Sequence, residues 1–158
     1  MFRGMNTRQI VLDSIAIALC VLTVAAVLIL WQRLPERIVT NFDFSGEVGT
    51  YSHKSRIFVL LGTMILMTAM FSVLLRIPAL YRHINMPWTI PWGKQPQIVS
   101  LTKDFLCITN LCITAGNVYL VVASVKGRLL NWLLWLPYGV MFAAMIWFLV
   151  RARKICKS

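Results

Sequence analysis

The sequence predicts an all-α integral membrane protein with four transmembrane helices, in a single domain that covers residues 1–158. Hydrophobic residues make up 59% of the chain and charged residues only 13%, whereas a soluble domain averages about 45–50% and about 25%. Four apolar windows, at about 10–31, 57–80, 105–125 and 129–150, are long enough to cross a bilayer, which takes about 20 residues. Because backbone groups in lipid must be satisfied within their own segment, we expect these windows to be helices.

The first window follows Arg3 and Arg8 and therefore has the charge pattern of a signal peptide. Its apolar core is longer than the roughly 7–15 residues of a signal peptide, and no A-x-A cleavage pattern follows it. We therefore expect a retained helix. The same window contains Asp13, which we expect to complement the helix dipole and to reach headgroup water. Asp13 is not predicted to relay protons, because the windows offer no second acid to pair with it.

The basic residues predict the orientation of the helices. Ten of the sixteen Lys and Arg residues lie at the two termini and around the second connection, and six lie in the first and third connections. By the positive-inside rule, both termini are expected to be cytoplasmic, and the connection 34–54 extracytoplasmic. Basic residues at helix ends are typical of contact with lipid headgroups, so the expected partners are the lipid bilayer and, as candidates, another membrane protein or a peptide, and no nucleic acid.

The other two connections restrict how the helices pack. The third, at 126–128, is so short that the last two helices must be antiparallel neighbours. In the last window, Pro137 is expected to kink the helix. The second connection contains four prolines, which are expected to exclude a regular helix through most of it: Pro78, Pro87, Pro91 and Pro96.

A polar stripe runs along the third window. Asn110, Thr114 and Asn117 fall at positions i, i+4 and i+7, on one face of a helix. We expect this face to point into the bundle, because lipid cannot satisfy amide groups. The stripe is consistent with a polar pathway for an ion or small solute, and also with hydrogen bonds that hold the helices together.

The connection 34–54 is the longest polar segment outside the expected bilayer and the candidate ligand-binding site. From residue 38 to residue 44 the pattern alternates, which indicates an extended segment, and Ser45 with Gly46 indicates a turn. A polar cap that binds a ligand is one interpretation, and a structural lid on the bundle is the other. The candidate binding residues are Asn41, Asp43, Glu47, Tyr51, His53 and Lys54.

This connection also resembles the loop signature of a bacterial membrane family, domain of unknown function 1648, which reads roughly L-P-x-x-I-P-x-H-F-N-x-x-G-x-P-D-x-Y-x-S-K. The resemblance implies a bacterial envelope protein with distant kinship to the first part of SdpI-type immunity proteins, which protect cells from a secreted peptide toxin. At the positions of the signature histidine and asparagine, this chain has Asn41 and Asp43. The matching residues, mostly ones that shape a loop, are Leu34, Pro35, Ile38, Phe42, Gly46, Tyr51 and Lys54.

Signatures of catalysis are missing from the sequence. It contains no nucleophile elbow, zinc motif, phosphate-binding loop or paired carboxylates, so no catalytic residue, metal or cofactor is predicted and the chain is not expected to be an enzyme. We expect a non-enzymatic bacterial inner-membrane protein with an extracytoplasmic binding or immunity-like module for a peptide, a lipid or a partner protein. A structural subunit of a larger membrane complex is the first alternative, and a small transporter is the second.

Overall fold

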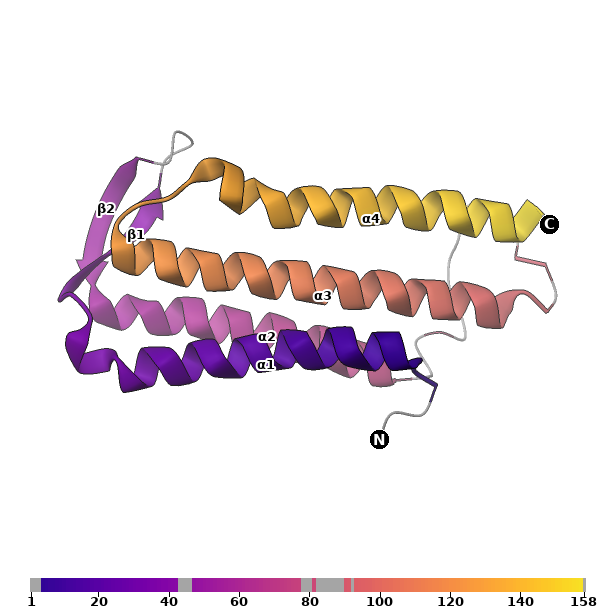
Figure 1. Cartoon of the computed structure of the whole chain (residues 1–158), viewed down its shortest axis with the longest axis horizontal. Coiled ribbons are helices and arrows are strands. Elements are labelled where there is room, and N and C mark those ends of the chain that lie inside the picture. Colours follow the sequence, from indigo (N-terminus) through magenta and orange to yellow (C-terminus); the bar gives the residue numbers. More distant parts are fainter. Residues whose placement is uncertain (1–3, 43–46, 78–80, 82–89, 92, 158) are drawn as a thin grey trace.

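The computed structural model describes residues 4–42, 47–77, 81, 90–91 and 93–157. In this part of the chain, four helices are long and apolar enough to cross a membrane, which confirms the predicted number. The helices run along one common axis, with the start of the first and the end of the fourth at the same end of the bundle, here called the terminal end (Figure 1). They are α1 (Thr7–Ile29), α2 (Ile57–Arg76), α3 (Gln95–Lys126) and α4 (Asn131–Lys157).

The third helix begins well before the apolar window that predicted it. Pro96 lies in its first turn, where the missing N–H has no helical partner to lose, so this proline starts the helix instead of excluding it. The first turns of α3 are polar, and for that reason the hydropathy of the sequence did not reveal them. α3 ends at Gly127, whose φ of +63° is the left-handed conformation that commonly follows a helix.

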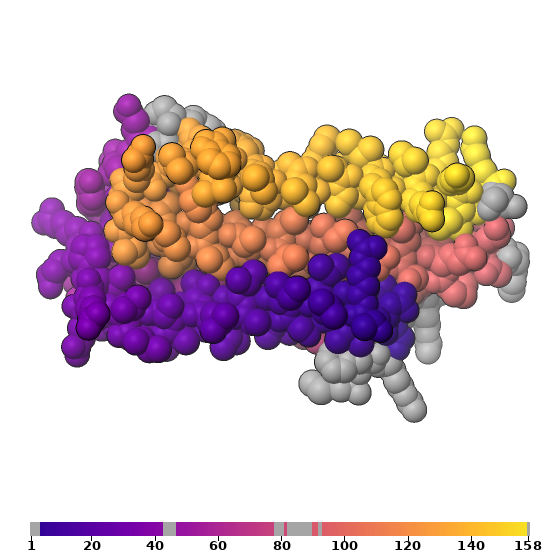
Figure 2. Space-filling view, in the orientation of Figure 1, coloured from indigo at the N-terminus to yellow at the C-terminus, as the bar shows by residue number. Residues whose placement is uncertain are grey.

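The fourth helix extends to Lys157 and therefore includes the basic run 151–157, which lies beyond the predicted window. Pro137 is inside α4 and cannot donate the usual backbone hydrogen bond there. In the described chain, the buried residues of α4 are only Ala144 and Ala152. Figure 2 shows α4 along one edge of the molecule, with α3 between it and α1.

The first connection forms a two-stranded antiparallel hairpin, β1 (Arg37–Phe42) with β2 (Val48–His53). The hairpin lies across the end of the bundle opposite to the termini, here called the hairpin end (Figure 1). Strict alternation of side chains fails in β1, because Ile38 and Val39 are both buried. Ile38 packs among the helices, while Val39 lies beside Gly127 in the α3–α4 turn, so each face of the strand is covered by a different element.

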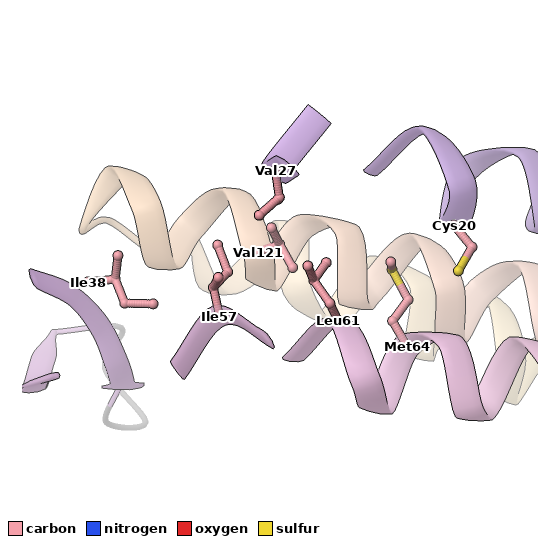
Figure 3. Close-up of a cluster of buried hydrophobic side chains, with 7 residues drawn as sticks. All are labelled: Cys20, Val27, Ile38, Ile57, Leu61, Met64 and Val121. Carbon is pink, nitrogen blue, oxygen red and sulfur yellow. The ribbon is translucent and has the colours of Figure 1, made fainter. Parts of the chain in front are cut away.

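A hydrophobic cluster fills the bundle below the hairpin (Figure 3). It joins side chains from α1, α2, α3 and β1, so it anchors the hairpin to the helices. Burial of such side chains stabilises the fold mainly through close packing, since lipid surrounds the outside of the bundle. The cluster consists of Cys20, Val27, Ile38, Ile57, Leu61, Met64 and Val121.

Candidate functional site

A buried polar cluster joins three helices in the half of the bundle near the termini. Asp13 of α1 forms an ion pair with Arg76 of α2, with 2.7 Å between Oδ2 and Nη2. Ser72 Oγ donates to Asp13 Oδ1 at 2.6 Å, and Asn110 Nδ2 of α3 donates to the same oxygen at 3.2 Å. The Asp13 side chain is 1% exposed and that of Arg76 is 23% exposed. We call these four residues the Asp13 cluster.

The position of Asp13 corrects the sequence prediction. Asp13 was expected to reach headgroup water near the start of its helix, but it lies about two turns into α1 and faces the bundle. Its partner, Arg76, is the final residue of α2 and was assigned to the second connection. A carboxylate excluded from water needs a counter-charge and hydrogen bonds, and Arg76, Ser72 and Asn110 supply them.

The predicted polar stripe on α3 divides into two parts. Asn110 and Thr114 are buried and bond across to α2, the latter through Thr68 with 2.9 Å between the hydroxyl oxygens. Asn117 instead donates to the carbonyl of Ile113 in its own helix, at 2.9 Å. The first two residues thus link helices, whereas the third satisfies its amide N–H locally.

Polar contacts between helices continue from the Asp13 cluster toward the terminal end through Gln9. Gln9 was not among the residues predicted from the sequence. Gln9 is buried, and its Nε2 donates to Asp104 Oδ1 at 2.8 Å and to the carbonyl of Ser100 at 3.1 Å. Asn6 Nδ2 donates to Ser100 Oγ at 3.2 Å. A single glutamine directly before the first apolar window, close enough to fall in the first turn of the same helix, is the signal that could have found it.

Among the described residues, side-chain hydrogen bonds between α1, α2 and α3 reach no farther toward the hairpin than the Thr68–Thr114 contact. Beyond it toward the hairpin, the interior is filled by the hydrophobic cluster of Figure 3, including Met64, Leu61 and Val121. The side chains that link α1, α2 and α3 by hydrogen bonds in the described structure therefore lie on the terminal side of this contact.

A cavity of about 560 Å³ lies under β1, between that strand and helices α2, α3 and α4. Its polar groups come from the strand and from the facing ends of α3 and α4, and its remaining walls are apolar. Among the predicted ligand-binding residues that the structure describes, Asn41 is the one that lines it. The lining consists of Thr40, Asn41, Phe42, Leu60, Leu120, Ser124, Leu129, Asn131, Leu134 and Trp135.

The other predicted binding residues lie elsewhere on the hairpin. Tyr51 and His53 line a separate hollow of about 510 Å³ together with Glu36, Arg37 and Ser52. Lys54 Nζ lies 5.2 Å from the centroid of the Trp31 ring.

His53 Nδ1 accepts a bond from the Ser55 backbone N–H at 3.3 Å and so caps the turn before α2. Glu47 is exposed, and Asp43 lies outside the described residues. The structure thus brings Tyr51 and His53 together but places Asn41 in a different cavity.

Four helices that are long and apolar enough to cross a membrane indicate a multi-pass membrane protein. Residues 18–74 match the family described as Domain of unknown function (DUF1648), which supports the family that the connection 34–54 resembles. The match covers about half of α1, both strands of the hairpin and nearly all of α2. No curated protein and no solved structure matches the chain.

Proposed function

We propose that the protein is a non-enzymatic binding module of the bacterial plasma membrane, with both termini cytoplasmic and the hairpin outside. Its ligand is amphipathic, either a peptide or a lipid, and occupies the cavity under β1. The observation that supports this proposal most directly is the volume of this cavity, about 560 Å³, which is within the usual range for ligand sites. An immunity-like role, in which the chain captures a membrane-active peptide, would use the same site.

The lining of the cavity supports an amphipathic ligand. Thr40 and Asn41 from β1 offer hydroxyl and amide groups on one side, and Ser124 adds a hydroxyl from α3. Leu120 and Trp135 belong to the apolar remainder of the wall. An apolar site with a few polar groups recognises the body of a ligand by packing and its orientation by hydrogen bonds.

Binding fits the interior of the bundle better than transport does. A transported ion or solute needs a polar route through the membrane. Among the described residues, side-chain hydrogen bonds between α1, α2 and α3 reach no farther toward the hairpin than Thr68 and Thr114, and the cluster containing Met64 and Leu61 lies between them and the hairpin. The buried Asp13 carboxylate is also neutralised by Arg76.

Site-specific photocrosslinking tests the proposal. Trp135 lines the cavity and Trp147 lies on the same helix outside it; each is replaced in turn by a photoreactive benzoylphenylalanine, in cells. We expect a discrete crosslinked product, identified by mass spectrometry, at position 135 but not at position 147. Ser124→Leu, which fills the cavity, is expected to remove that product. Identical products at both positions, or no effect of Ser124→Leu at normal protein abundance, would contradict the proposal.

A second candidate, a structural subunit of a larger complex, is favoured by α4. This helix buries only Ala144 and Ala152 in the described structure, and large side chains such as Trp132 and Phe142 are exposed. A partner protein could cover this face. Mild-detergent purification followed by native mass spectrometry would show a stoichiometric second protein if this candidate is correct, and the chain alone with bound lipid if it is not.

A further inference from the structure

A buried lysine at the terminal end of the bundle has no acidic partner among the described residues. The side chain of Lys103 on α3 is buried, and the whole residue is 6% exposed. Its Nζ donates to the carbonyl of Gly4 at 2.7 Å and lies 5.1 Å from the centroid of the Tyr81 ring. Among the described residues, no ion pair joins Lys103 to a carboxylate, and the one ion pair found is that of Asp13 with Arg76.

The groups around Lys103 do not supply the missing negative charge. The next residue, Asp104, accepts a bond from Gln9 at 2.8 Å and makes no ion pair with Lys103. Burial raises the pKa of Tyr81 to about 12, so its hydroxyl stays neutral, and it donates to the carbonyl of Leu74 at 3.0 Å. A buried ammonium that is balanced only by a carbonyl and a neutral ring is costly, because an ion removed from water needs an opposite charge.

A cavity of about 510 Å³ adjoins this lysine. Polar side chains of Asn6, Gln95 and Ser100 line it, each able to donate a hydrogen bond, together with Lys103. The cavity also lies at the first turns of α3, where the helix dipole favours a negative charge. All of these features are complementary to an anion.

The lengths of the helices place this cavity at a membrane surface. α3 has 32 residues, which at 1.5 Å per residue is roughly 48 Å, against about 30 Å for the hydrocarbon core. Its first turns therefore extend into the headgroup layer. α4 ends at the same height, since Ala152 packs against Ile98 and Leu101, and it brings Arg151 and Arg153 there.

We propose that this cavity is a binding site for a phosphate group, whose oxygens would pair with Lys103 Nζ and accept hydrogen bonds from Asn6 and Ser100. The phosphate could belong to an anionic phospholipid of the surrounding leaflet or be free in solution. Inside the site, Lys103 gains the counter-charge that the described protein does not provide. The site is separate from the cavity under β1, which lies at the hairpin end.

Thermal unfolding of the full chain in a neutral maltoside detergent tests this site. The probes are dioleoyl phosphatidylglycerol, dioleoyl phosphatidylcholine and inorganic phosphate, the last compared with chloride at equal ionic strength. We expect phosphatidylglycerol to raise Tm in a saturable manner, and phosphatidylcholine to raise it less. For Lys103→Met, we expect the concentration that gives half of the shift to increase about tenfold, since a charged hydrogen bond is lost.

Two further variants make the result decisive. Arg153→Met removes an exposed positive charge at the same end and is expected to leave the half-saturating concentration unchanged. Val99→Trp fills the cavity while keeping Lys103, and is expected to weaken binding as Lys103→Met does, which covers the case in which Lys103→Met fails to fold.

The measurement with inorganic phosphate shows whether the bound phosphate group is free in solution or belongs to a lipid headgroup. A Lys103-dependent shift with inorganic phosphate assigns the site to the phosphate group itself, and a shift with phosphatidylglycerol alone assigns it to a lipid headgroup; both outcomes support the proposal. Equal losses in Lys103→Met and Arg153→Met would overturn it, because general attraction of anions by the basic end would then explain binding. The proposal would also be overturned if phosphatidylglycerol and inorganic phosphate both failed to shift Tm.

Discussion

At the scale of single residues, the Asp13 cluster is a buried set of polar side chains that joins α1, α2 and α3. The sequence placed Asp13 in the first helix and Asn110 in the third, and it placed Asn110 and Thr114 on one face. It did not predict the pairing with Arg76, because a contact between residues 13 and 76 depends on how far α2 is shifted along α1. Such a shift is determined by packing and leaves no periodic pattern in the sequence.

Removing one partner of the Asp13–Arg76 ion pair is predicted to lower the stability of the protein more than removing both partners does. Asp13→Asn removes the carboxylate that pairs with Arg76 and leaves a neutral amide in a site largely closed to water, and we expect it to lower the free energy of unfolding by about 2–3 kcal/mol. The double variant Asp13→Asn with Arg76→Met is expected to lose less. Equilibrium unfolding in detergent measures both, with Glu36→Gln on the exposed hairpin end as a control. A double variant that loses the sum of the two single effects would show that the two residues do not interact.

At the scale of elements, hydropathy predicted the number of helices but not all of their ends. The apolar windows identify the membrane-spanning part of each helix, while the polar first turns of α3 and the basic last turns of α4 carry no such signal. The hairpin was foreseen as an extended segment with a turn. Its burial pattern was not, because Val39 is covered by the α3–α4 turn, an element that is distant in the sequence.

The α3–α4 turn offers a test of backbone conformation. Gly127 has a φ of +63°, and a Cβ atom there would meet Val39 Cγ2 at 3.7 Å, an ordinary contact. Gly127→Ala should therefore destabilise the protein by about 1 kcal/mol through its backbone rather than through a clash. Gly62→Ala is the control: it lies in α2 with no atom near its would-be Cβ and should be neutral or stabilising. A thermal unfolding series in detergent compares the two, and equal Tm values for both variants would contradict the assignment.

At the scale of the whole molecule, the composition of the sequence predicts the class of protein and its basic residues predict an orientation, while the two cavities proposed as binding sites emerge only from packing. The cavity under β1 needs one strand and three helices to meet, and Asn41 is its only lining residue that the sequence analysis had selected as a binding residue. Lys103 was counted only as a basic residue beside a loop, because its burial depends on Gly4 and Tyr81, which come from other parts of the chain.

The proposed orientation is testable by cysteine labelling in intact bacteria. In a variant without the four native cysteines, Thr50→Cys on the hairpin should react with a membrane-impermeant maleimide in intact cells. Arg153→Cys near the end of α4 should react only after the cells are made permeable. The reverse pattern would show that the termini face outward, and labelling of both positions in intact cells would indicate mixed orientation.

The ion pair between α1 and α2 also bears on how the chain enters its membrane during synthesis. Asp13 alone would carry a negative charge into hydrocarbon, and Arg76 alone a positive one. Because the two lie at the same depth on consecutive antiparallel helices, a helical pair that inserts together carries no net charge at that level. The first two helices with their hairpin therefore form the natural unit of insertion, and α3 completes it later by adding Asn110 to the carboxylate.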